Sequence, residues 1–511
     1  MRHGWERWGS VLAGILSGLL FALAFPPYSL VLLLPLALIP WLIALSREES
    51  PWRALLSGVV FSLVYWCASI PWIVYVVTHY GGQNAPMGVV CLVLLALILA
   101  EWPALVAFAT VAVAPPASGW RLALFPLLWS ASEHLRCVVY KGFPWNLTGH
   151  ALFRHPIWMQ TASLWGVFGV GALVAAVAVL LARTIAARTL VPATAAMALV
   201  LGAGVFGAWR IARPAPGSEE LAVALLQPNL TEEMRASSAG AAAGYKSVLA
   251  QADEASNELP ALIVLPESAL PLYWQRSERL RQDLATVAMR GPAILFNDVE
   301  EDPDGRYYNS ARLLTSQGIA HHSYRKVHLV PFGEYVPLPK VFFFVRQISS
   351  EIGAFSAAPE PELLKAGPFV IGVGVCYEIL YPSLVRGEVA GGANLLATIS
   401  NDSWYGRAGA QEQHFAGAVL RSVENSRYLM RAAITGISGI VDDRGRILRE
   451  SPADERTILT GTVRLVREQT AWTRWGLALP TAADIAAGVV LLYGLFRLRR
   501  RAPRVESKTS P

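Results

Sequence analysis

The decapeptide Phe369-Val-Ile-Gly-Val-Gly-Val-Cys-Tyr-Glu378 holds the clearest structural signal in the chain. Its apolar run ends at Val375 and predicts a buried strand. The strand is followed at once by a thiol, an aromatic ring and a carboxylate. A strand that ends at reactive side chains is one way in which a rigid sheet presents a nucleophile. A lone cysteine can equally be a small buried apolar residue, so Cys376 by itself leaves both interpretations open.

Two other stretches carry residues that would complete a site around this thiol. They are Leu265-Pro-Glu-Ser268 and Tyr324-Arg-Lys-Val-His-Leu-Val-Pro-Phe-Gly-Glu334. Glu267 follows a short apolar strand, and burial of a carboxylate raises its pKa towards the range of a general base. Lys326 supplies a cation that can stabilise a thiolate or an oxyanion. Taken singly, Glu267 could be a solvated acid at a strand end, and Lys326 could belong to a basic surface.

The composition of the chain indicates a membrane protein. The chain has 511 residues, of which 54% are hydrophobic and 16% charged, and its mean hydropathy is +0.41. Eight apolar segments approach the roughly 20 residues that a helix needs to cross the hydrocarbon of a bilayer. We expect spans at residues 8–25, 30–45, 54–77, 86–114, 120–137, 157–181, 189–211 and 477–498. Pro103 predicts a kink in the fourth span.

The arginines give these spans an orientation. They cluster between the second and third spans, between the sixth and seventh, and after the eighth. The positive-inside rule then puts both termini in the cytoplasm and the large polar segment outside it. The net charge of +6 is modest, and the arginines lie beside apolar segments, so we interpret them as topology signals and expect no nucleic-acid surface. The loop 133–156 breaks the rule with Arg136, Lys141 and Arg154, which could hold anionic headgroups or could be ordinary helix-end residues.

The polar segment has the pattern of a layered α/β domain. Strands are predicted at 221–226, 261–265, 293–296, 310–315, 369–375, 394–399 and 432–441, and helices at 241–254, 278–289 and 411–427. The run Val341-Phe-Phe-Phe344 is either a core strand or an apolar loop that dips into lipid near the thiol.

The motifs PES, RKxHLVPFGEYVP and CYE, in this order, resemble those of the nitrilase superfamily. The apolar spans around them narrow the resemblance to the apolipoprotein N-acyltransferase family. It implies a nitrilase-like α-β-β-α sandwich inserted into an eight-helix transmembrane bundle. Residues 1–215 would form seven helices, 216–472 an extracytoplasmic catalytic domain, and 473–511 the last helix and a basic tail.

The resemblance also implies a set of site residues. Glu267, Lys326 and Cys376 would form a catalytic triad, with Glu334 as a second essential carboxylate. The remaining candidates are Tyr377 and Glu378 beside the thiol, and Asn401 and Trp404 in a pocket loop. For Tyr377 and Glu378, simple packing and a turn salt bridge are the alternative. The resemblance implies no metal and no organic cofactor, and the four cysteines have no spacing of a disulfide framework or zinc site.

The implied reaction is a two-step acyl transfer in the bacterial inner membrane, with the catalytic domain on the periplasmic side. The donor would be a phospholipid, phosphatidylethanolamine by resemblance, and a Cys376 thioester would carry the acyl chain. The acceptor would be the α-amino group of an S-diacylglyceryl cysteine at the N-terminus of an apolipoprotein. We expect a monomer. Two alternatives stay open: a membrane-tethered amidohydrolase with the same triad, and a transporter or scaffold with a degenerate nitrilase domain.

Overall fold

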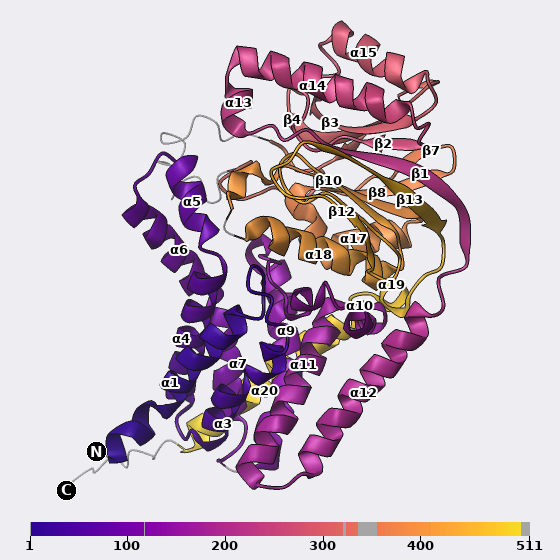
Figure 1. Cartoon of the computed structure of the whole chain (residues 1–511). Helices are drawn as coiled ribbons and strands as arrows, with labels where there is room; N and C mark the ends of the chain where they lie inside the picture. Colours follow the sequence, from indigo (N-terminus) through magenta and orange to yellow (C-terminus); the bar gives the residue numbers. More distant parts are fainter. Residues whose placement is uncertain (1, 117, 320–322, 336–354, 408, 502–511) are drawn as a thin grey trace, which may run out of the picture.

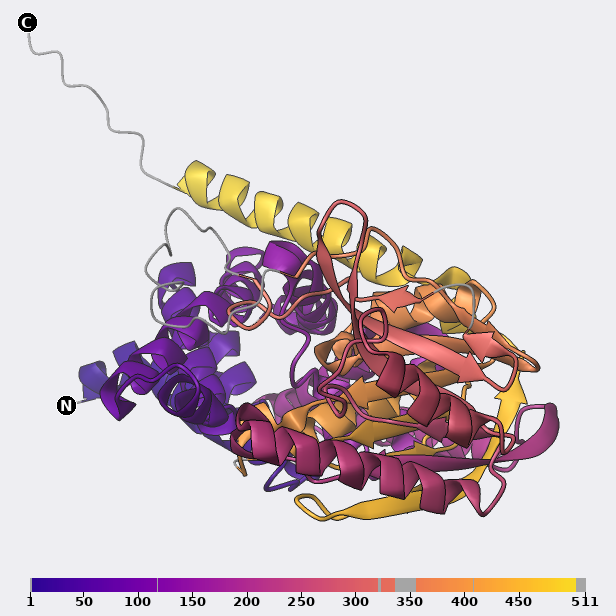
Figure 2. The same ribbon diagram turned by 90° about the horizontal axis from the view of Figure 1, so that it is seen from above.

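The computed structural model describes residues 2–116, 118–319, 323–335, 355–407 and 409–501. Long helices form one half of the molecule, and two stacked sheets with their helices form the other (Figure 1). The start of α1 (Arg2–Ala22) and the end of α20 (Ala478–Arg501) both lie at the end of the helices farthest from the sheets (Figure 1). Seen from above, α20 runs along one flank of the molecule (Figure 2).

The helical half follows the predicted apolar segments. Five helical stretches are long and apolar enough to cross a membrane: Pro51–Ser69, Ala85–Ala112, Ala162–Ala187, Val191–Ile211 and Ala478–Arg500. Two shorter apolar helices are Trp8–Ala22 and Leu33–Arg47. The predicted fifth span divides into α8 (Gly119–Ala123) and α9 (Phe125–Val138). By length and composition, the described residues therefore give five candidate spans rather than the expected eight.

Two of the predicted spans are divided by prolines. In the third predicted span, residues 54–77, α4 (Pro51–Ser69) ends before Pro71 and α5 (Trp72–His79) begins just after it. In the fourth predicted span, residues 86–114, α6 (Ala85–Leu99) ends before Ala100 and α7 (Glu101–Ala112) begins just after it. Pro103 lies four residues after Leu99 and has no N–H for the Leu99 carbonyl. The predicted kink thus falls before the proline, where its missing hydrogen bond interrupts the ladder.

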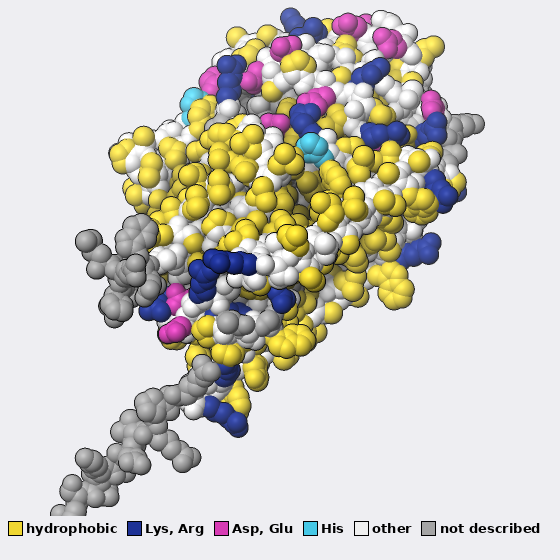
Figure 3. Space-filling model, turned by 60° about the horizontal axis from the view of Figure 1, so that its bottom comes forward, with side chains coloured by type: hydrophobic (Ala, Val, Ile, Leu, Met, Phe, Trp, Pro, Cys, Tyr) yellow, Lys and Arg dark blue, Asp and Glu magenta, His cyan; other side chains and the backbone are white. Residues whose placement is uncertain are grey.

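The other helices of this half are two of the five candidate spans, Ala162–Ala187 and Val191–Ile211, and shorter helices that connect the spans or cover their ends. They are α2 (Leu33–Leu36), α3 (Ile39–Arg47), α10 (Pro156–Met159), α11 (Ala162–Ala187), α12 (Val191–Ile211) and α19 (Ala471–Trp475), with short 3₁₀ turns η1 (Val139–Lys141) and η2 (Thr148–Leu152). Apolar side chains cover most of the helical surface turned forward in Figure 3. Exposed apolar residues of the helical half include Leu94, Ile98, Val205 and Leu492, each about half exposed or more. An apolar surface this extensive indicates contact with lipid.

The other half is an α-β-β-α sandwich, as the resemblance implied. The first sheet has the order β13-β1-β2-β3-β4-β5 with β6 on β4, and the second has the order β12-β11-β10-β9-β8-β7. The first sheet comprises β1 (Gly217–Gln227), β2 (Leu262–Val264), β3 (Ala293–Glu301), β4 (Tyr307–Thr315), β5 (Gly318–Ile319), β6 (Tyr324–Arg325) and β13 (Thr457–Val466). The second comprises β7 (Leu364–Ala366), β8 (Phe369–Val375), β9 (Leu395–Ser400), β10 (Leu429–Ala433), β11 (Gly439–Val441) and β12 (Ile447–Glu450).

Helices cover both outer faces of the sandwich. On the first sheet lie α14 (Ser238–Ser256) and α15 (Glu278–Ala288), and α13 (Glu232–Ala236) precedes them. On the second lie α17 (Pro382–Ala390) and α18 (Ala410–Asn425), and these two helices separate it from the membrane helices (Figure 1). Val223, Val264, Val373 and Ala397 belong to the buried core between the sheets. Most predicted strands and helices are found close to their expected bounds.

One predicted element is wrong. The strand expected at 432–441 is two antiparallel strands, β10 and β11, in which Leu429 pairs with Val441. The chain reverses between them, where the Ala433 N–H donates to Ser438 Oγ and Arg431 Nε donates to the Ile437 carbonyl. Two side chains inside an apolar run thus supply the hydrogen bonds of a turn that hydrophobicity alone does not reveal.

One buried glutamine forms several hydrogen bonds between the sandwich and the membrane helices. Gln413 of α18 donates to the carbonyls of Pro26 and Ser69 at 2.8 and 2.7 Å. Its side-chain oxygen accepts from the indole N–H groups of Trp72 and Trp145 at 3.2 and 2.7 Å. All four hydrogen bonds that this amide makes therefore reach elements outside the sandwich.

Candidate active site

Cys376 lies where β8 passes into a 3₁₀ turn, η3 (Cys376–Leu380). Its φ of 55° is in the left-handed region, which costs energy for a residue with a Cβ. Ser400 Oγ, at the end of the neighbouring strand β9, lies 3.6 Å from the Cys376 sulfur. The residue is 6% exposed. The thiol is thus held on a tight turn between two strand ends in the interior.

The structure brings Glu267, Lys326 and Glu334 together with the thiol. Lys326 Nζ is 2.9 Å from Glu334 Oε1 and 3.9 Å from Glu267 Oε1. Asn309 Nδ2 donates to both carboxylates, at 2.8 Å each. The Cys376 thiol lies close enough to Glu267 for each group to affect the pKa of the other. Three chain segments that are far apart in sequence therefore meet around one sulfur atom.

Burial and neighbouring charges set the protonation behaviour of these groups. Burial raises the pKa of Glu267, Lys326 counteracts this, and Glu334 raises it further. Burial would lower the pKa of Lys326, but the nearby carboxylates of Glu334 and Glu267 raise it on balance. Burial, with the charge of Glu267, raises the pKa of the Cys376 thiol. The thiol is therefore neutral at rest and needs a base to become a nucleophile.

Glu378 joins the nucleophile turn to the lysine segment. Its Oε1 accepts from the N–H groups of Val327 and His328 at 2.7 and 2.8 Å. Its Oε2 accepts from the Val375 N–H at 3.0 Å and from the Tyr324 hydroxyl at 2.8 Å. Burial raises the pKa of Glu378 to about 7, against the lowering effect of Lys326. This carboxylate therefore sets the position of Lys326 relative to Cys376.

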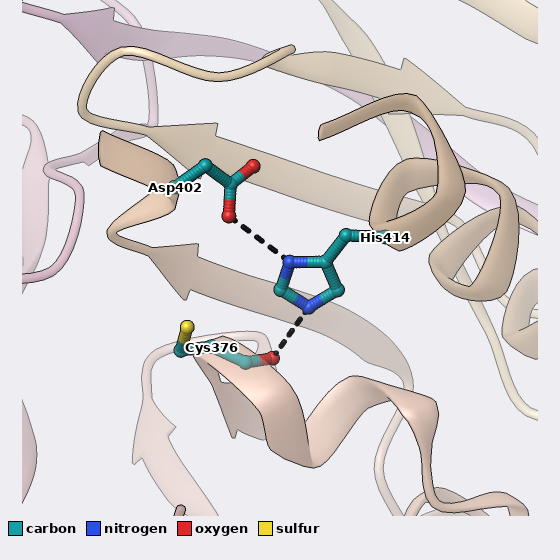
Figure 4. A group of neighbouring side chains, drawn as sticks. All are labelled: Cys376, Asp402 and His414. Atoms are coloured by element: carbon teal, nitrogen blue, oxygen red, sulfur yellow. Dashed lines mark hydrogen bonds and ion pairs between the residues drawn. The ribbon is translucent and has the colours of Figure 1, made fainter. Parts of the chain in front are cut away.

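A buried histidine, His414, contacts the backbone of the turn that carries Cys376 (Figure 4). His414 Nε2 lies 3.1 Å from the Cys376 carbonyl oxygen, and Nδ1 lies 3.0 Å from Asp402 Oδ1. Asp402 also accepts from Ser400 Oγ at 2.7 Å and from Arg431 at 2.5 Å. Burial would raise the pKa of Asp402, but Arg431 and His414 hold it well below its usual range.

His414, Asp402 and Arg431 are not among the residues predicted for the site. Asp402 stands in the predicted pocket loop, but the histidine and the arginine carry no distinctive spacing. Cys376, Asp402 and His414 offer ligand atoms within 4.8 Å of one another, which is compatible with a metal ion. Both ring nitrogens of His414 are already bonded, and Asp402 pairs with Arg431. A cation would have to compete with a guanidinium, so these residues fit a hydrogen-bond network better than a metal site.

Comparison with known proteins gives two adjoining domain matches. Residues 17–180 match the apolipoprotein N-acyltransferase N-terminal domain, and residues 222–471 match the carbon-nitrogen hydrolase domain. Similar curated proteins include apolipoprotein N-acyltransferases from Geobacter metallireducens, 35% identical over 94% of both chains, and from Methylococcus capsulatus, 31% identical over 96% of both chains. The chain belongs to the apolipoprotein N-acyltransferase family. It is therefore a membrane-bound acyltransferase, and a transporter or scaffold is set aside.

Of the predicted pocket residues of this family member, Asn401 contacts the candidate catalytic cluster directly. The Asn401 N–H donates to Glu267 Oε2 at 3.0 Å, and its amide donates to Glu232. Trp404 packs against Tyr80 of the membrane half, with ring centroids 4.5 Å apart. Tyr377 is buried and stacks on Trp145 at 6.3 Å. Asn401 thus touches the candidate base, whereas Trp404 and Tyr377 face the membrane helices.

Aromatic rings line the region between the thiol and the membrane helices. Tyr405 packs against Trp72 at 4.9 Å and against Trp145 at 5.5 Å. Tyr381 stacks on His328 at 4.1 Å. Trp72 and Trp145 come from the membrane half, and the other three come from the sandwich. Rings from both halves therefore line one side of the site, and we call this set of rings the aromatic floor.

The three cations of loop 133–156 have different surroundings. Arg136 is buried and donates to the carbonyls of Phe143 and Trp145 at 2.9 and 2.7 Å. Arg154 pairs with Glu450 at 2.8 Å. Lys141 is exposed, and its ammonium lies 4.5 Å from the Tyr335 ring centroid. Arg136 and Arg154 are occupied by these intramolecular contacts, so of the three cations only Lys141 suits an anionic headgroup. The apolar run 341–344 lies outside the described residues.

Proposed function

We propose that this chain transfers an acyl chain from a membrane phospholipid to the N-terminal α-amino group of a diacylglyceryl lipoprotein. The observation that supports this most is the meeting of Glu267, Lys326 and Cys376 above an aromatic floor shared with the membrane helices. Membership of the acyltransferase family supports the same reaction class. The phospholipid donor, the lipoprotein acceptor and the thioester intermediate all belong to this proposal.

In the first step Glu267 takes the proton of the Cys376 thiol. The thiolate attacks the ester carbonyl of the phospholipid, and Lys326 stabilises the oxyanion that forms. When the tetrahedral intermediate collapses, the C–O bond breaks and the leaving alkoxide takes the proton from Glu267. The products are a Cys376 thioester and a lysophospholipid. Because burial raises the pKa of Glu267, the same carboxyl can accept and return the proton.

In the second step the α-amino group of the lipidated cysteine attacks the thioester. Glu267 takes a proton from the amine, and Lys326 again faces the oxyanion. The C–S bond then breaks, an amide forms, and the thiolate of Cys376 recovers a proton from Glu267. Water competes with the amine for a thioester, so exclusion of water by the aromatic floor favours transfer over hydrolysis.

The phospholipid donor reaches the site from the bilayer in this proposal. Trp72 and Trp145 connect the membrane half with the rings around the thiol. Lys141 is placed to meet an anionic phosphate group, as phosphatidylethanolamine carries. We also propose a monomer, because Glu267, Lys326 and Cys376 come from the same chain.

The membrane orientation is a further part of the proposal. The catalytic domain, residues 216–472, would lie on the periplasmic side of the bacterial inner membrane, between residues 1–215 and 473–511. Both described chain ends and the connection between α11 and α12 lie at the end of the helices remote from the sheets (Figure 1). This connection carries Arg188, and the positive-inside rule puts it in the cytoplasm.

Trapping the acyl-enzyme tests the proposal. Purified protein is mixed with a phospholipid labelled in its sn-1 chain, and the protein is separated under denaturing conditions without thiols. We expect a labelled, hydroxylamine-sensitive band that Cys376→Ala and Cys376→Ser lack. A chase with a diacylglyceryl-cysteinyl peptide should move the label to the peptide amine. Label retained by Cys376→Ala would contradict the assignment of the nucleophile.

The amidohydrolase alternative predicts a different product. The same triad could form a thioester with a small amide, and water would then release the acid. Ammonia release from small amides without transfer of label from phospholipid to peptide would favour the hydrolase.

A further inference from the structure

A cavity lies on the side of the first sheet that faces α14. It is one side chain away from the catalytic cluster, because Asn297 lines it and donates to Asn309, which in turn donates to Glu267. Its volume is about 250 Å³, and it is lined by residues of α14, of the loop 268–273 and of the end of β3. Ser268, one of these residues, directly follows Glu267. The cavity approaches the lower end, roughly 300 Å³, of sites that hold small ligands. It lies at the end of β2, within a few ångströms along the chain from the candidate base.

The lining of the cavity carries a polar group with spare bonding capacity. Arg235 donates to the Ser268 carbonyl at 2.9 Å and pairs with Glu232. Its Nε is buried and has no hydrogen-bond partner among the described residues. A buried donor without a partner costs free energy, so it favours a ligand that brings an acceptor. Apolar Leu230 and Ala241 share the wall, so the cavity suits a group that is part polar and part apolar.

The outer edge of the cavity is exposed. Pro271 and Tyr273 line it, and Tyr273 is 43% exposed. Most of the membrane helices lie beyond the second sheet, on the opposite side of the sandwich (Figure 1), whereas the end of α5 reaches α13, where His79 bonds to Glu233 at 2.7 Å. A ligand that occupied the cavity would thus lie on the side of the sandwich that is turned away from most of the membrane helices.

We propose that this cavity binds the first peptide residues that follow the lipidated cysteine of the acceptor. The inference rests on the proposed function, because it assigns a path to one of its two substrates. The diacylglyceryl group stays in the bilayer, whereas the polypeptide must leave on the aqueous side. A peptide offers one carbonyl acceptor per residue, which Arg235 Nε can meet, and each extended residue advances about 3.3 Å. The cavity would therefore contribute to binding in the second step.

Varying the acceptor length tests this in the unmodified protein. The acyl-enzyme is formed first from labelled phospholipid, and its decay is then followed with two acceptors. One is diacylglyceryl cysteine amide, and the other carries three further residues. We expect the longer acceptor to have kcat/KM about tenfold higher, the effect of one hydrogen bond to a charged group. Equal values for the two acceptors would overturn the proposal.

A matched pair of variants locates the effect. Ala241→Trp fills the cavity, whereas Ala242→Trp makes the same change one residue along α14, where the side chain is exposed. The measured quantity is the ratio of the two acceptor rates within each protein. Ala241→Trp should bring this ratio close to one, and Ala242→Trp should keep the unmodified ratio. If both variants keep it, the cavity does not bind the peptide.

The length series alone decides the question if Ala241→Trp does not fold. Failure of the proposed function looks different from failure of this inference. In the first case, the unmodified protein forms no labelled acyl-enzyme from phospholipid. In the second, it forms the acyl-enzyme and transfers the chain, but with no dependence on acceptor length.

Discussion

His414 Nε2 lies 3.1 Å from the backbone carbonyl oxygen of Cys376. The histidine comes from α18 and the cysteine from the end of β8, and their contact holds a residue whose φ is 55°. Left-handed backbone at such a residue persists only where its surroundings fix it. The ring is itself fixed by Asp402, which Arg431 neutralises. The conformation of the nucleophile thus depends on a chain of side chains that would not touch the substrate.

Replacing His414 should slow acylation without preventing lipid binding. His414→Ala removes one buried hydrogen bond to the turn, so we expect the rate of acyl-enzyme formation to fall about tenfold or more. KM for the phospholipid should change little. His414→Gln, which keeps a donor at a similar reach, should restore part of the rate. The exposed His155→Ala is the control. A rise in KM at an unchanged kcat would show that the histidine binds substrate instead.

Replacing the Glu378 carboxylate with an amide should lower the thermal stability of the protein. Glu378→Gln replaces one acceptor oxygen by an NH₂ group that faces donors of the backbone or of Tyr324. Each buried donor left unpaired costs about 1–3 kcal/mol, so the midpoint of thermal unfolding in detergent should fall. Glu388→Gln is the matched control, because Glu388 is equally buried but accepts only from the Val373 N–H among the described residues. Equal losses for the two variants would count against the special position of Glu378.

Removing the charge of Glu334 should move the acid limb of the acylation rate to lower pH. Glu267 acts as a base only when ionised, so the rate falls as the pH drops through its pKa. Burial raises this pKa above 4.5, and Glu334 adds to the rise. Glu334→Gln removes that contribution, and single-turnover acylation measured across pH should show the lower midpoint. A shift to higher pH would mean that the loss of the Lys326 partner dominates.

Gln413→Leu should loosen the junction between the sandwich and the membrane helices. The change strands two indole N–H groups and two carbonyls, and each buried group left unpaired costs about 1–3 kcal/mol. Hydrogen exchange should rise near Ser69 and Trp145. Gln411→Leu is the control on the same helix, since the Gln411 side chain makes no hydrogen bond within the described part of the chain. Unchanged exchange in Gln413→Leu would show that other contacts hold the junction.

The sequence predicted those parts of the site that stand at strand ends. Cys376 and Glu267 each follow an apolar run, and such runs specify both a strand and the residue at its end. The turn that carries Lys326 and Glu334 could be seen in the motif around Pro331. The α-β-β-α arrangement came from the resemblance, because alternating strands and helices are compatible with several layered folds.

Other residues could not be found from the sequence for physical reasons. His414 and Gln413 lie in a helix whose residues are almost all buried, so no amphipathic pattern sets them apart. Asn309 acts through its amide, and one asparagine on a strand has no distinctive spacing. Each of these three residues has at least one partner more than 25 residues away along the chain. The number of membrane spans stays a prediction, because prolines and short segments such as α9 divide the apolar runs.

The pairing of β1 with β13 has an evolutionary and practical consequence. Val223 lies opposite Gly461, so the strand that begins the sandwich and the strand that ends it run antiparallel as neighbours. The polypeptide therefore leaves the sandwich beside the place where it arrived. A soluble ancestor could have been spliced between two helices through this pair of adjacent strands with little disturbance to either partner. The same adjacency lets a protein engineer exchange the whole sandwich through two cuts.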